Sequence, residues 1–108
     1  MEKIYNKLVR NEIPSIIINN GGKPYTKILD DKSYKEELEK KLLEEYNEVL
    51  NSTTQEERIE ELADMLEIIE SLANIEGKEL NDVIETAKDK KIKRGGFSKK
   101  IYLEKVIE

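Results

Sequence analysis

Residues 33–76 read SYKEELEKKLLEEYNEVLNSTTQEERIEELADMLEIIESLANIE, and the architecture follows from them. Apolar residues recur every three or four positions on both sides of a short polar break, which is the spacing of an amphipathic helix. Ser33 and Thr54 each begin a capping box, the pattern that favours a helix start. The stretch therefore predicts two helices, at about 33–50 and 54–76, that pack antiparallel as a hairpin.

The flanking segments extend this helical pattern within one domain, residues 1–108. Asn and Gly residues at 19–22 predict the end of a helix at 11–19, and a third long helix is expected at about 79–91, before a loop at 94–97. Two stretches alternate weakly and could form a minor strand pairing, namely 25–29 and 100–103. We expect a mainly all-α fold, a helical hairpin or bundle.

Composition excludes several classes of protein. Charged residues make up 40% of the chain and aromatic residues 6%, which suits a thin helical bundle. There is no Cys and no His, which excludes a zinc site of the usual ligand types, a Cys or His nucleophile and a Ser-His-Asp triad. The chain has neither a membrane-spanning apolar run nor a signal peptide, so we expect a cytoplasmic protein that binds no membrane. A pI near 5 argues against nucleic-acid binding.

Each of the two long helices carries carboxylates where its apolar stripe should continue. At about 100° per residue, Glu45 and Glu61 fall inside the stripes, and Glu48 and Asp64 follow three residues later on the adjoining edges. Buried carboxylates without partners are costly, and a divalent cation would offset that cost. All-oxygen ligation favours Mg²⁺, with Mn²⁺ as the alternative. The predicted metal ligands are therefore Glu45, Glu48, Glu61 and Asp64. The competing interpretation is that these carboxylates reach water or pair with Lys41 or Arg58.

The basic residues gather at the two ends of the chain. Residues 1–85 carry 11 basic and 21 acidic side chains, whereas residues 86–108 carry 8 basic and 3 acidic ones. Such residues could bind phosphate, or they could simply complement a helix dipole and remain solvated. The candidates for phosphate or substrate binding are Lys7, Arg10, Lys90, Lys91 and Arg94.

The carboxylates form a recognisable motif. Glu44-Glu45-Tyr46-Asn47-Glu48, then 12 residues, then Glu61-Leu62-Ala63-Asp64 is an EExxE…ExxD pattern. It resembles the MazG-like, all-α nucleoside triphosphate pyrophosphohydrolase superfamily. The segments 5–10 (YNKLVR), 29–31 (LDD) and 90–97 are similar to its phosphoribosyl-ATP pyrophosphohydrolase-like branch. Asn11 departs from the Asp expected in that branch, which leaves the role of this position open.

The resemblance implies a Mg²⁺-dependent enzyme that cleaves the α–β phosphoanhydride of a nucleotide to give a monophosphate and pyrophosphate. It implies a homodimer or tetramer. Glu45, Glu48, Glu61 and Asp64 would hold the metal. Glu44 would be an auxiliary acid that orients a water or holds a further ion, so that Glu44 and Glu45 are the catalytic residues. Phosphate contacts would come from Lys90 and Arg94, with Lys7 and Arg10 as pocket residues.

Two substrate classes remain open on the sequence: non-standard or surplus nucleoside triphosphates, and phosphoribosyl-ATP. A hypothesis of a different class is a non-catalytic helical oligomer that binds a nucleotide or a protein partner. Metal-dependent turnover would separate the two classes.

Overall fold

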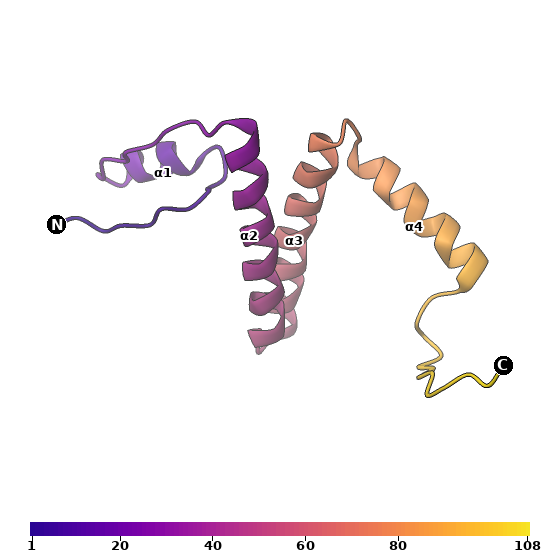
Figure 1. Ribbon diagram of the computed structural model, residues 1–108. Coiled ribbons are helices and arrows are strands. Elements are labelled where there is room, and N and C mark those ends of the chain that lie inside the picture. The colour runs from indigo at the N-terminus through magenta and orange to yellow at the C-terminus, as the bar shows by residue number, and fades with distance from the viewer.

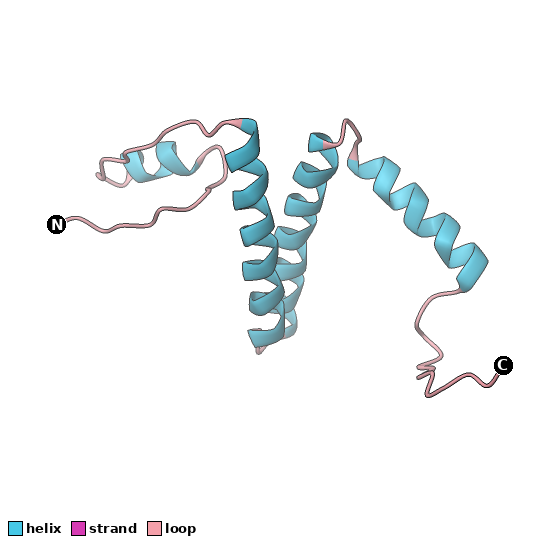
Figure 2. Cartoon of the chain, viewed as in Figure 1, coloured by secondary structure: helices cyan, strands magenta, loops and turns pink.

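The computed structural model describes residues 1–108 as four helices joined by loops, with no strand (Figures 1 and 2). The expected all-α class is confirmed. In chain order the helices are α1 (Ile13–Asn19), α2 (Asp31–Asn51), α3 (Gln55–Ile75) and α4 (Leu80–Arg94).

The centre of the molecule is the antiparallel pair α2 and α3, as the sequence predicts (Figure 1). The turn between them is held by hydrogen bonds to the end of α2. The Ser52 hydroxyl donates to the carbonyl oxygen of Val49 at 2.6 Å, and the Arg58 guanidinium donates to the same oxygen at 3.2 Å. Thr54 then caps α3, because its hydroxyl oxygen accepts from the backbone N–H of Glu57 at 3.1 Å. These bonds fix how α3 returns along α2.

The start of α2 differs from the prediction. The helix begins at Asp31, and the carboxylate of Asp30 accepts from the backbone N–H of Ser33 at 2.8 Å. Ser33 is therefore not the capping residue. The physical reason is that Asp is as good a cap as Ser, and a second acid at Asp31 suits the positive end of the helix dipole. Two smaller differences concern the other helices: α1 begins at Ile13 rather than at 11, and α4 continues to Arg94.

The minor strand pairing predicted between 25–29 and 100–103 is wrong. Neither segment is a strand, and no backbone hydrogen bond joins them. Figure 1 shows the second segment beyond the far end of α4, on the opposite side of the molecule from the first. A lone two-stranded pairing is marginal in water, so the weak alternation of these segments was insufficient to produce it.

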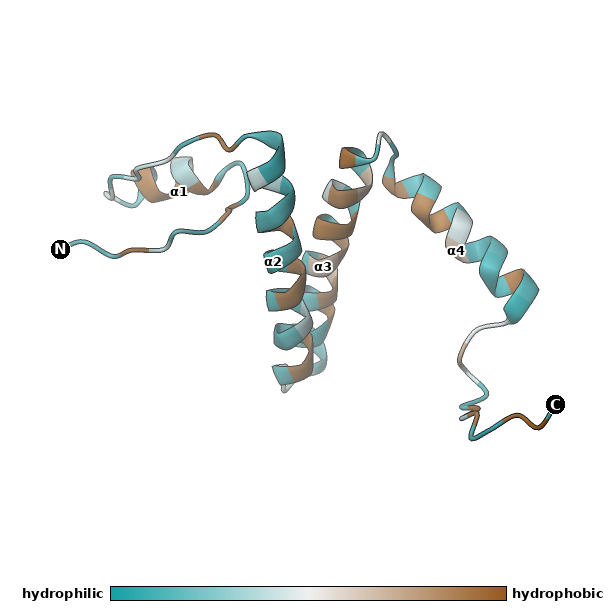
Figure 3. Ribbon diagram, viewed as in Figure 1, coloured by the Kyte–Doolittle hydropathy of each residue, from teal (hydrophilic) through white to brown (hydrophobic).

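Little of the chain is buried. Only four residues lie in the interior, all on the two central helices: Leu38, Val49, Ile68 and Ala73. The radius of gyration is 18.5 Å, against about 13 Å for a compact chain of this length. Apolar residues also continue along α3 and α4 where nothing covers them (Figure 3). A single copy of the chain therefore leaves much of its apolar surface in water.

The outer helices diverge from the central pair. Gly77, with φ of 75°, turns the chain after α3, and the N–H of Lys78 donates to the carbonyl oxygen of Ala73 at 3.0 Å. From there α4 contacts α3 and no other helix, while α1 contacts none of the others. None of the four helices combines the length and the apolar character needed to cross a membrane.

Candidate metal centre

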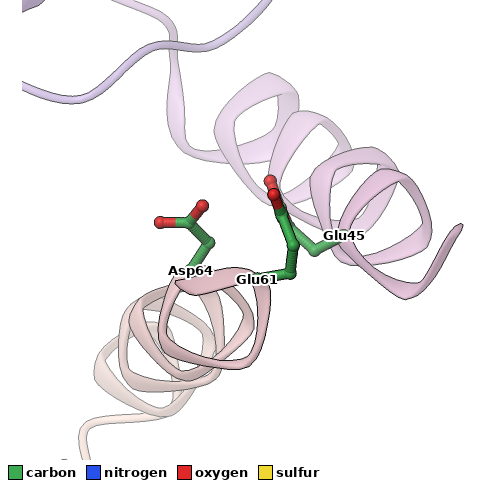
Figure 4. A group of neighbouring side chains, drawn as sticks. All are labelled: Glu45, Glu61 and Asp64. Atoms are coloured by element: carbon green, nitrogen blue, oxygen red, sulfur yellow. The ribbon is translucent and has the colours of Figure 1, made fainter. Parts of the chain in front are cut away.

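Three carboxylates from the two central helices lie close together, with those of Glu45 and Glu61 meeting and that of Asp64 to one side (Figure 4). Glu45 projects from α2, and Glu61 and Asp64 project from successive turns of α3. One oxygen from each of the three lies within 4.8 Å of the other two. The cluster forms because both helices place a carboxylate in the stripe along which they pack, as the sequence predicts.

Glu45 is the most perturbed member of the cluster. Its Oε2 atom is shielded from solvent and has no hydrogen-bond donor within reach. Burial raises the pKa of Glu45 to about 7, and a hydrogen bond shared with Glu61 and the charge of Asp64 act in the same direction. The Lys41 ammonium opposes this shift only weakly. The hairpin therefore contains a partly buried carboxyl group with one oxygen that no donor satisfies.

The donor set fits a hard divalent cation. An orphaned carboxylate oxygen is the feature that a cation would satisfy, and carboxylate oxygens are the ligands that Mg²⁺ prefers. The three carboxylate oxygens lie within 4.8 Å of one another, so the three side chains could share a single cation. Because Mg²⁺ keeps several waters or substrate oxygens, three protein carboxylates are sufficient.

Beside the cluster lies an open groove of about 470 Å³. Its lining contains no apolar residue and combines acidic, basic and amide side chains: Lys7, Lys41, Glu44, Glu45, Asn47, Glu48 and Glu61. Glu44 and Glu48, which the sequence assigned to the site, therefore line the groove and stand apart from the three clustered carboxylates. The Glu44 carboxylate accepts from Lys41 at 3.5 Å, a long and exposed contact. Such a lining suits a charged, hydrated ligand.

The N-terminal segment brings two basic residues to the site. Lys7 lines the groove, with its ammonium 5.8 Å from the centre of the Tyr5 ring. The Arg10 guanidinium donates to Oδ1 of Asp64 at 2.8 Å, which joins residues 54 positions apart. Both residues were predicted to be pocket residues, and the structure places both beside the carboxylates.

The C-terminal basic residues lie elsewhere within one chain. Lys90, Lys91 and Arg94 are exposed on the last turns of α4, which diverges from α2 (Figure 1). None of them forms an ion pair with the clustered carboxylates. They could reach such a cluster only on another copy of the chain or after a movement of α4.

Sequence reasoning missed two features of the site. Asn47 lines the groove, and its position between Tyr46 and Glu48 in the acidic motif was the available signal. The pairing of Arg10 with Asp64 had no signal, since nothing local links residues so far apart in the chain.

Comparison of the chain with protein-family models, with curated proteins and with solved structures gives no match.

Proposed function

We propose that this chain is a Mg²⁺-dependent nucleotide pyrophosphohydrolase, which cleaves the α–β phosphoanhydride of a nucleoside triphosphate or of a phosphoribosyl-ATP-like nucleotide. The observation that carries the proposal is the convergence of Glu45, Glu61 and Asp64, with one Glu45 oxygen buried and unpartnered. The resemblance of the EExxE…ExxD motif to the MazG-like superfamily supplies the reaction class.

In this proposal some carboxylates bind the cation and another accepts the proton of the attacking water. The three clustered carboxylates and Glu48 would hold Mg²⁺, which when bound polarises phosphate oxygens and lowers the pKa of a coordinated water. Glu44, exposed at the rim of the groove, would accept the proton as the water oxygen bonds to phosphorus and the bridging P–O bond breaks. Pyrophosphate and a monophosphate would then leave.

The groove suits the polyphosphate part of such a substrate. Its volume falls within the roughly 300–1,000 Å³ range of small-molecule sites, and its lining is entirely polar. Lys7 and Lys41 would offset phosphate charge there. The groove offers no apolar wall for a base, so base selectivity would depend on residues outside it.

The proposal includes a homodimer or tetramer. Apolar side chains on the outer faces of the central helices are about half exposed, and a second copy would bury them: Leu43, Tyr46, Leu50, Ile59, Leu62 and Leu66. The neighbouring copy could also bring Lys90, Lys91 and Arg94 to the groove, which a single chain does not do.

Pyrophosphate release tests the activity. The purified protein is incubated with a panel of nucleoside triphosphates, including deoxy and damaged forms, and with phosphoribosyl-ATP, with Mg²⁺ or with a chelator. We expect Mg²⁺-dependent release, its loss in Glu45→Gln, and its retention in Glu60→Gln, a matched change at an exposed neighbour of Glu61 that makes no ion pair.

The second candidate function is a helical oligomer that binds a nucleotide or a protein partner without turnover. The large exposed apolar surface favours it. Nucleotide binding without pyrophosphate release from any substrate, by a folded and metal-loaded sample, would support this function and overturn the first.

A further inference from the structure

A single ion pair ties the N-terminal arm, residues 1–12, to the acidic cluster. It is the ion pair between Arg10 Nη2 and Asp64 Oδ1, at 2.8 Å. No other hydrogen bond or ion pair joins the arm to the central helices, and α1, which follows the arm, contacts neither of them. This pair is therefore the one polar contact that holds the arm beside the site.

The pair occupies a carboxylate that the proposed cation would need. Asp64 belongs to the cluster with Glu45 and Glu61, so the guanidinium already pairs with one of the three carboxylates that a divalent cation would use. We propose that Arg10 is an internal counterion, which competes with the divalent cation for Asp64 and is released when the cation binds. This inference rests on the proposed function, because that function supplies the cation.

The energetics allow this exchange. The Arg10 and Asp64 side chains are 59% and 43% exposed, and exposed ion pairs change an equilibrium by no more than about five-fold. A divalent cation shared by three carboxylates would therefore displace the guanidinium without unfolding any helix. Helices α2 and α3 would keep their positions while the arm gains freedom.

Release of Arg10 would also prepare the substrate site. Lys7 on the same arm already lines the groove, and a freed guanidinium three residues later could bind phosphate oxygens with two parallel hydrogen bonds. Loading of the cation would thus be coupled to formation of a phosphate clamp. Without the cation, Arg10 would stay paired with Asp64 and the arm would stay beside the cluster.

The first test is cation affinity, measured by titration calorimetry with Mn²⁺ in the absence of nucleotide. Competition predicts that Arg10→Gln binds Mn²⁺ about two- to five-fold more tightly than the wild type. The matched control is Lys3→Gln, which removes the same charge from the same arm, from a side chain that lies over the Tyr5 ring and contacts no carboxylate. It should change the affinity less.

The second test is proteolysis of the arm in the full chain. Trypsin must bind the Arg10 side chain to cut after it, so Mn²⁺ should raise the rate of cleavage after Arg10 relative to cleavage after Lys3. Equal or weaker Mn²⁺ binding by Arg10→Gln, or an unchanged cleavage ratio, would overturn the Arg10 proposal while leaving the proposed function in place. Failure of the wild type to bind any divalent cation would overturn both.

Discussion

Glu45 and Glu61 meet carboxyl to carboxyl across the α2–α3 hairpin (Figure 4). Burial, the neighbouring Glu61 carboxyl and the charge of Asp64 raise the pKa of Glu45 to about 7. Near neutral pH, Glu45 is therefore protonated in a substantial fraction of the metal-free molecules, at the point where a cation would bind.

The stability of the metal-free protein should depend on the charge of Glu45. Its folded pKa of about 7 lies above its ordinary value of 4.5, so its contribution is most favourable below pH 4.5 and is lost as the pH rises through 7. In chelator at pH 8, Glu45→Gln should raise the free energy of unfolding by about 1–2 kcal/mol, with little effect at pH 4. Urea denaturation measures this. Glu39→Gln, an exposed change on the same helix, is the control, and equal effects at both pH values would contradict the prediction.

Cation binding should release a proton. A cation requires the ionised form of Glu45, so affinity for Mg²⁺ should rise between about pH 5 and pH 7 and level off above pH 7. Calorimetry at pH 6 in buffers of different ionisation heat counts the released protons. Glu45→Gln should remove both the release and the pH dependence, and a wild-type affinity independent of pH would refute this account.

The turn between α2 and α3 should be sensitive to Thr54 and insensitive to Ser33. Thr54→Ala removes the side-chain oxygen that accepts from the Glu57 N–H and should cost about 1 kcal/mol of unfolding free energy. Ser33→Ala should change it by only a few tenths, because Asp30 supplies the cap of α2. Urea denaturation of both variants measures these changes. A larger loss of unfolding free energy in Ser33→Ala than in Thr54→Ala would indicate that Ser33 is the capping residue after all.

Association should depend on the exposed apolar face of the hairpin. Leu62 and Leu66 are 44% and 46% exposed, and Leu62→Glu with Leu66→Glu would place two charges on that face. We expect the wild type to elute as a dimer or tetramer in chromatography with light scattering, and the double variant as a smaller species. Glu60→Gln controls for a change of charge on the same helix. A monomeric wild type at about 100 μM would contradict the proposed assembly.

The central hairpin and its acidic cluster were predictable because their determinants are local. The helical period and the carboxylates that interrupt it all fall within the quoted stretch of 44 residues, and packing of two antiparallel helices brings Glu45 to Glu61 and Asp64. The cap of α2 was predicted wrongly because Asp30 and Ser33 are both strong capping residues, and only the backbone geometry distinguishes them.

The remainder depends on contacts between segments far apart in the chain. The pairing of Arg10 with Asp64 is set by the path of the arm, which no periodic pattern encodes. The separation of Lys90 and Arg94 from the cluster follows from the direction in which α4 leaves α3 after Gly77. The predicted role of these residues at the phosphates stays a prediction.

All three clustered carboxylates lie within residues 45–64, so the contacts that assemble them are short in sequence. Structures built on short-range contacts form early in folding, and helices and tight loops close within microseconds. Like charges would then be brought together in the transition state itself. Divalent cations should therefore accelerate refolding, measured by stopped-flow. The ligand would then speed the formation of its own site as well as stabilise the folded site.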